Sequence, residues 1–200
     1  MNHPPTILLL AGPLAAEGCS EPVPAGLDAL LTQAMASNLP VRMVAPPDLA
    51  SWARQRLPGS QVIVPPEPMP ESRRWLGQAI RAGVQSSANA QGWLLLPAEL
   101  PSTQARTLLT LAHSLARYAV VYPQYGQTQG HPIGFSSEMY SELVRLEHDH
   151  DLVRLAARYP ATAISTDDPG IVMPASVPHG LQRWHSPQPS ARRVSAHALS

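Results

Sequence analysis

Short runs of consecutive apolar residues alternate with longer segments in which apolar residues recur every three or four positions. The first run, Ile7 to Ala11, ends at Gly12-Pro13, and similar runs follow at 41–45, 62–64, 93–96, 119–122 and 161–165. A short continuous apolar run closed by glycine or proline is typical of a strand buried on both faces. We therefore predict a strand at each of these positions.

The segments between these runs have helical periodicity. They span residues 27–35, 48–57, 75–84, 105–115, 137–146 and 152–159. Asp48 and Ser102 stand before two of these patterns, and short polar residues cap helices, so we expect a cap at each. The stretch 125–130 contains glycine and resembles a hairpin. We therefore expect 133–135 to be a strand that runs in a different direction from the others.

Alternation of short strands with helices predicts a three-layer α/β/α sandwich with a Rossmann-like, mostly parallel sheet. In such sheets ligands bind beyond the carboxyl ends of the strands, which indicates the loops after Ala11, Leu96 and Tyr122. We expect one domain over residues 1–185. Residues 186–200 are rich in Pro, Ser, Arg and His without an apolar period, so we expect a mobile tail there.

Composition narrows the classes of partner. The formal net charge is zero, and all 14 cationic side chains are arginines, because the chain contains no lysine. We therefore expect neither nucleic acid nor a membrane as a partner. No apolar run approaches the roughly 18 residues that span a bilayer, and a cytoplasmic location is the expectation. The single cysteine, Cys19, excludes an internal disulfide and a cysteine-based zinc site.

Two groups of residues invite a chemical interpretation. Gly130-His131-Pro132 precedes an apolar turn, a helix near Ser137 and, about 35 residues on, Asp168-Pro169-Gly170. The second group, His148-Asp149-His150-Asp151, holds two imidazoles and two carboxylates, as a metal site would. Residues at i and i+2 do not share a helix face, so the spacing favours a solvated turn between helices over a metal site.

The order of these elements resembles the MobA-like nucleotidyltransferases, in particular the molybdenum cofactor cytidylyltransferase and guanylyltransferase branch, over nearly the whole chain. The family's first strand runs into a glycine-rich loop whose amides cradle phosphates. Ala11, Gly12 and Gly18 match that loop, and Gly77 matches a further nucleotide-binding position. Leu14, Ala16 and Glu21 stand where the family has serine, arginine and lysine, so the resemblance implies a degenerate phosphate site.

The resemblance also implies a metal and an acceptor site. Glu99, in Leu96-Pro97-Ala98-Glu99-Leu100-Pro101, stands where the family has a metal-binding aspartate, and it would bind Mg²⁺. Gly130, His131 and Pro132 match the loop beside the acceptor substrate. The family's closing carboxylates have no counterpart in residues 174–180. Alternatively, Glu99 is a surface acid before a helix, and His131 is a turn residue that bonds the backbone.

Three functions are compatible with this pattern. An active enzyme would use Mg²⁺ to transfer a nucleotide from CTP or GTP to a phosphorylated cofactor, with arginines such as Arg73, Arg74 or Arg81 replacing the missing lysine. A member with lost or much reduced transferase activity would act as a binding or accessory protein in molybdenum cofactor handling. Its partners would be a nucleotide or phosphorylated small molecule and a protein. The third is an α/β protein with an unrelated small-molecule site. The departures from the family pattern favour the second.

Overall fold

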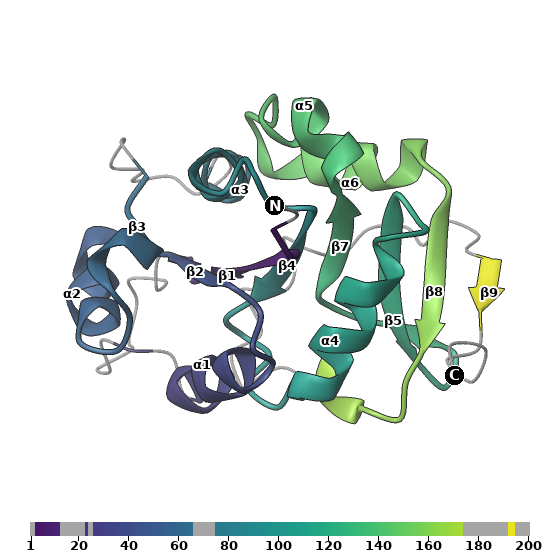
Figure 1. The fold of residues 1–200 in the computed structure, drawn as a ribbon, viewed down its shortest axis with the longest axis horizontal. Coiled ribbons are helices and arrows are strands. Elements are labelled where there is room, and N and C mark those ends of the chain that lie inside the picture. The colour runs from purple at the N-terminus through teal and green to yellow at the C-terminus, as the bar shows by residue number, and fades with distance from the viewer. Residues whose placement is uncertain (1–2, 13–22, 24–25, 66–74, 174–191, 195–200) are drawn as a thin grey trace.

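The apolar runs of the sequence form one mixed sheet with helices on both faces (Figure 1). The computed structural model describes residues 3–12, 23, 26–65, 75–173 and 192–194. The strands are β1 (Thr6–Leu10), β2 (Val41–Val44), β3 (Val62–Ile63), β4 (Gly92–Pro97), β5 (Val120–Tyr125), β6 (Thr128–Gln129), β7 (Ile133–Ser136), β8 (Ala161–Ser165) and β9 (Arg192–Val194).

The strand order is β3-β2-β1-β4-β7-β5-β8-β9, with β6 beside β5. Strands β3, β2, β1 and β4 are parallel, as are β5, β8 and β9. Strand β7 is antiparallel to both β4 and β5, which confirms the predicted change of direction at 133–135. The chain builds outward from β1 to β3 and then returns to β4 on the other side of β1. The order therefore reverses between β1 and β4.

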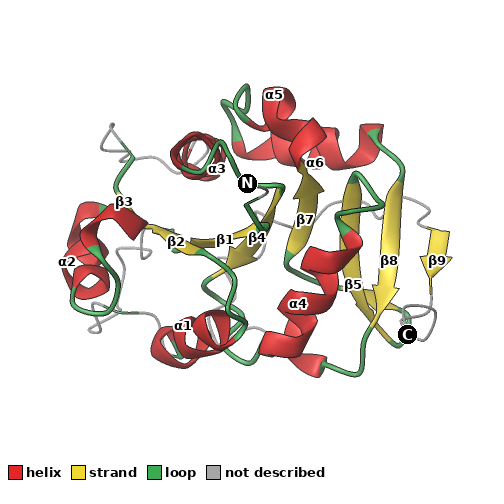
Figure 2. Cartoon of the chain, in the orientation of Figure 1, coloured by secondary structure: helices red, strands yellow, loops and turns green. Residues whose placement is uncertain are grey.

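Helices cover the two faces of this sheet in separate groups (Figure 2). Helices α1 (Leu27–Ala36), α2 (Pro47–Arg54) and α4 (Ala105–Ser114) pack on one face, and α3 (Trp75–Ser86), α5 (Tyr140–Leu143) and α6 (Asp149–Arg158) pack on the other. Alternate strand residues serve the two cores: Leu8 and Leu10 point to the α3 side, Ile7 and Leu9 to the α1 side. Because side chains alternate along a strand, a continuous apolar run fills both cores. The predicted three-layer sandwich is confirmed.

Two predicted helix caps are wrong. Helix α2 begins at Pro47, whose fixed φ suits the first helical position, so Asp48 lies in the first turn instead of capping it. Helix α4 begins after Gln104, two residues beyond Ser102. In both cases the cap was inferred from residue type alone, whereas the start of the helix depends on proline geometry or on a distant partner.

The helical segment predicted at 137–146 is shorter and tighter than expected. A 3₁₀ turn at Ser137–Met139 precedes α5, and Ser136 makes no side-chain capping bond. Helix α6, in contrast, begins three residues earlier than predicted, at Asp149. The group at 148–151 therefore consists of the N-cap residue and the first three residues of α6, and is not a linker between two helices.

Part of the predicted tail forms a strand. Arg192–Val194 is β9, and it pairs in parallel with β8. Residues 186–191 and 195–200 lie outside the described part of the chain, so the boundary at residue 185 stays a prediction. Among the described residues, no helix has the length and apolarity needed to cross a bilayer.

Candidate functional site at the carboxyl edge of the sheet

The reversal of strand order brings the ends of β1 and β4 side by side. Leu10 pairs with Pro97, and the Ala98 amide donates to the Leu10 carbonyl at 3.0 Å. Gly12 and Glu99 follow this pair on neighbouring strands, each by two residues. In open α/β sheets the crevice outside such a reversal is the usual ligand site. The two sequence-predicted positions therefore share the edge where the parallel strands end, here called the carboxyl edge.

The phosphate-loop positions begin beside helix α3. An added Cβ at Gly12 would lie 3.5 Å from the ring of Trp75, the first residue of α3. Ala11 is fully buried, and its amide donates to the Val44 carbonyl at 3.0 Å. That N–H belongs to the sheet and cannot also donate to a phosphate. Gly18 and the exchanged positions 14, 16 and 21 lie outside the described residues.

Glu99 lies in a tight turn directly after the buried strand β4. The Leu100 amide donates to the Pro97 carbonyl at 3.3 Å, and Glu99 itself is half-buried. A carboxylate at the end of a central strand suits Mg²⁺, a hard cation that takes oxygen ligands and retains several waters. The position fits the chemistry of a metal bound with substrate phosphates, while the metal role itself stays a prediction.

The Gly130-His131-Pro132 loop reaches the same edge from β7. Ile133 pairs with Leu95 of β4, so the residues before Ile133 lie level with the end of β4. His131 is half-buried and donates its amide to the Ile171 carbonyl at 3.1 Å, and the His131–Pro132 peptide is cis. A Cβ at Gly130 would collide with the same carbonyl. Close backbone approach therefore explains why Gly130 is glycine, independently of any ligand.

Asp168 connects two segments at this edge through hydrogen bonds to its side chain. This side chain was not assigned a role from the sequence. Its Oδ2 accepts from the Gln104 amide at 2.9 Å and from the Thr107 hydroxyl at 2.7 Å, and its Oδ1 accepts from the Gly170 amide at 2.9 Å. Asp168 is fully buried. It thereby caps α4 from a segment more than 60 residues away in sequence, taking the role predicted for Ser102.

The ion pair of Asp167, the exposed neighbour of Asp168, was not predicted from the sequence. Asp167 pairs with Arg106 in the first turn of α4, with Oδ1 2.9 Å from Nη2, and both side chains are more than half exposed. This arginine lies near the carboxyl edge. Arg73 and Arg74 lie outside the described residues, and Arg81 is exposed in the middle of α3. Only the pairing of distant segments reveals Arg106, because nothing in its local sequence differs from an ordinary helix start.

Gly77 lies at a helix contact. An added Cβ would be 3.0 Å from backbone atoms of Glu147 and His148, so the first turn of α3 packs directly on the turn before α6. The Leu76 amide at the same place donates to Asp149 Oδ1 at 2.9 Å. Close packing accounts for glycine at this position, and its assignment to nucleotide binding stays a prediction.

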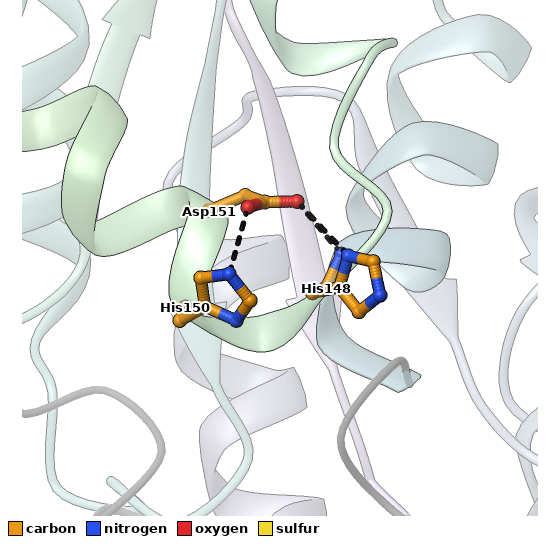
Figure 3. A group of neighbouring side chains, drawn as sticks. All are labelled: His148, His150 and Asp151. Carbon is orange, nitrogen blue, oxygen red and sulfur yellow. Dashed lines mark hydrogen bonds and ion pairs between the residues drawn. The ribbon is translucent and has the colours of Figure 1, made fainter.

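His148, His150 and Asp151 meet at the start of α6 (Figure 3). His148 Nδ1 is 3.6 Å from Asp151 Oδ2, and His150 Nε2 is 3.3 Å from Oδ1. The two imidazoles stack with their centroids 5.3 Å apart. The spacing argument against such a meeting was wrong, because His148 is the N-cap residue with an extended backbone (φ −126°) and does not yet follow the helix.

The carboxylate of Asp151 is held by the backbone. Its Oδ2 accepts from the amides of His148 at 2.9 Å and Glu147 at 3.1 Å. Partial burial raises the pKa of Asp151, but these backbone hydrogen bonds and the two neighbouring imidazoles outweigh burial and lower the pKa below its usual value. The ionised form is therefore the one that this site favours.

Strands that build outward from a central reversal, with Gly12 and Glu99 directly after the two strands at that reversal, define the class of doubly wound α/β proteins, which bind ligands at this point. Residues 27–187 match the MobA-like NTP transferase domain. The chain belongs to this family, as the resemblance predicted. A search of curated proteins finds no significant match.

Solved structures share the fold. The chain is similar to Rv0371c from Mycobacterium tuberculosis H37Rv, solved in complex with manganese, at 22% identity and a TM-score of 0.65, over 83% of this chain and 89% of that one. A homologue of Rv0371c from Mycobacterium sp. strain JC1 has 18% identity and a TM-score of 0.69, over 90% of this chain and 92% of that one. Molybdopterin-guanine dinucleotide biosynthesis protein A from Archaeoglobus fulgidus has 13% identity and a TM-score of 0.57, over 89% of this chain and 95% of that one. At these identities the likeness establishes the fold alone.

Proposed function

We propose that this protein has lost most or all nucleotidyltransferase activity and serves as a binding or accessory protein in molybdenum cofactor handling. The observation that carries the proposal is the exchange of charge in the sequence that matches the family's phosphate loop. Ala16 and Glu21 stand where the family has cationic residues, and the whole chain has no lysine. Phosphoryl transfer depends on charge neutralisation more than on covalent chemistry, so this loss removes the main source of catalysis.

The size of the electrostatic effect supports the proposal. Two unit charges about 4 Å apart at an effective dielectric near 20 interact by roughly 4 kcal/mol. Replacing attraction by repulsion at one phosphate therefore lowers triphosphate affinity by several powers of ten. A smaller phosphorylated ligand, with fewer charges to neutralise, fits this edge better. The Gly130-His131-Pro132 loop is the position that we assign to it, with a protein as the further partner.

The alternative is an active Mg²⁺-dependent enzyme that transfers a nucleotide from CTP or GTP to a phosphorylated cofactor. One observation favours it: Glu99, Gly12 and His131 share a single edge of the sheet, as the donor, metal and acceptor sites of such an enzyme would. Glu99 would hold Mg²⁺, which would bridge the phosphates and neutralise their charge. Arg106, beside the same edge, would supply cationic charge if it left Asp167.

Thermal denaturation with CTP, GTP or ATP, each with Mg²⁺, separates the two. A native-state ligand stabilises by RT ln(1 + [L]/Kd), so we expect no shift in Tm at millimolar nucleotide. A shift of several degrees would show that triphosphate is still bound and would contradict the loss of charge neutralisation on which the proposal depends. The matched gain-of-function test is the double change Ala16→Arg, Glu21→Lys, which should create triphosphate binding. Continued absence of binding in that variant would count against the degenerate-site explanation.

A further inference from the structure

The cluster of His148, His150 and Asp151 at the start of α6 has no role in the nucleotide chemistry considered above. Its three potential ligand atoms lie within 4.8 Å of one another. Each imidazole faces a different oxygen of the Asp151 carboxylate, which bridges the two rings (Figure 3). We propose that these three residues bind a first-row transition-metal ion of the Zn²⁺ type, at a site separate from the Mg²⁺ position at Glu99.

The spacing of the ligand atoms matches such an ion. Metal–ligand bonds of about 2.0–2.1 Å in a tetrahedron separate ligand atoms by roughly 3.3–3.4 Å. His150 Nε2 is 3.3 Å from Asp151 Oδ1 and His148 Nδ1 is 3.6 Å from Oδ2, so each nitrogen is at about this separation from one of the two carboxylate oxygens. One ligand atom from each of the three residues lies within 4.8 Å of the other two, so binding needs rotation of the imidazoles to bring both nitrogens around a single ion. Water would complete the coordination on the solvent side, where the His150 side chain is 55% exposed.

The chemistry of the donors selects the metal. Two imidazole nitrogens with one carboxylate oxygen suit Zn²⁺, Co²⁺, Ni²⁺ or Cu²⁺, whereas Mg²⁺ prefers oxygen and water. The helix N-terminus carries a partial charge of roughly +0.5, which opposes a cation. Asp149 and Asp151 in the same first turn of α6 more than offset it.

The cluster also has the outer support that metal sites have. The amides of Glu147 and His148 bond Oδ2 of Asp151 and fix the orientation of the carboxylate, which leaves Oδ1 directed at His150. Such second partners hold ligands in place before the metal arrives. A bound ion would lock the 147–151 turn, on which Gly77 packs and from which Asp149 holds the start of α3.

The test uses the full chain after treatment with a chelator. Zn²⁺ is titrated by calorimetry, and Co²⁺ is followed by its visible absorption, with the wild type, His150→Gln and His113→Gln. His113 is an exposed histidine in the last turn of α4, outside the cluster, and controls for the loss of one imidazole. We expect the wild type and His113→Gln to bind alike and His150→Gln to bind at least tenfold more weakly, as loss of a ligand costs no less than loss of its outer support.

Three outcomes would overturn the proposal. They are absence of saturable Zn²⁺ binding in the wild type, equal affinity of wild type and His150→Gln, and displacement of Co²⁺ by equimolar Mg²⁺. His148→Gln is the second variant if His150→Gln fails to fold, and it should weaken binding similarly. Because Mg²⁺ and nucleotide are absent from the Zn²⁺ titration, failure here leaves the proposed function unaffected, and the converse also holds.

Discussion

At the level of single side chains, Asp168 does the most to define the candidate site. It is fully buried, and the hydrogen bonds to it come from two backbone amides and a hydroxyl rather than from a cation. A carboxylate stripped of water is stable only when such donors replace the water. Asp168 therefore joins the start of α4 to the 168–171 segment that carries Ile171, the acceptor for the His131 amide.

Asp168→Asn should lower the free energy of unfolding by about 2–4 kcal/mol, because an amide nitrogen would face an N–H or O–H donor and leave it unsatisfied. Asp167→Asn is the matched control. That residue forms only an exposed pair with Arg106, so the expected change is below about 1 kcal/mol. Urea denaturation of both variants measures the difference. Equal midpoints would contradict the role given to Asp168.

Among the elements, the contact between α3 and the turn before α6 connects the start of the loop after β1 with the cluster of His148, His150 and Asp151. Gly77 permits the close approach, and Asp149 satisfies an amide at the start of α3. Trp75 of the same turn lies against Gly12. A shift of α3 is therefore expected to move the start of the loop after β1 and the cluster of His148, His150 and Asp151 together.

Gly77→Ala should destabilise the protein by about 1–3 kcal/mol, because its methyl group meets backbone rather than a flexible side chain. Gly59→Ala is the control: a Cβ there has nothing within 4 Å, and the change should be neutral or slightly stabilising. Thermal denaturation of the two variants measures this difference in stability. A neutral Gly77→Ala would exclude close packing as the reason for glycine at this position.

For the molecule as a whole, the absence of lysine simplifies how its charge depends on pH in the alkaline range. Arginine stays charged in alkali, and there is no lysine whose loss of charge would overlap with the ionisation of Tyr122. Tyr122, on β5, is 6% exposed. Burial raises its pKa from 10.0 to about 12, because the phenolate would lose its hydration.

This shift predicts how stability depends on pH. Because the folded-state pKa lies above the unfolded value, the contribution of Tyr122 is complete below pH 10 and is lost as pH rises towards 12. A shift of this size corresponds to roughly 2–3 kcal/mol. Tyr122→Phe should flatten the fall in unfolding free energy over this range, while Tyr125→Phe, at a position that is 42% exposed, should not. Equal slopes in the two variants would exclude the assignment.

Periodicity was sufficient for most of the fold. Apolar runs predicted the central strands. The hairpin-like stretch at 125–130 correctly predicted that the next strand, β7, runs in a different direction. These features are local, because burial on two faces requires a continuous apolar run and burial of a helix requires a period of 3.6. The family followed from motif positions and was confirmed over residues 27–187.

Hydrophobic periodicity could not predict contacts between residues that are far apart in the sequence. Asp168 and Gln33, each more than 60 residues from the start of α4, accept from its first two amides. The extended backbone at His148 turns its imidazole towards Asp151. Both results depend on how elements pack, and packing sets backbone angles and donor positions that residue type does not encode. The sequence thus specified the layers and the family through local hydrophobic pattern, whereas three-dimensional packing selected the partners of each polar side chain.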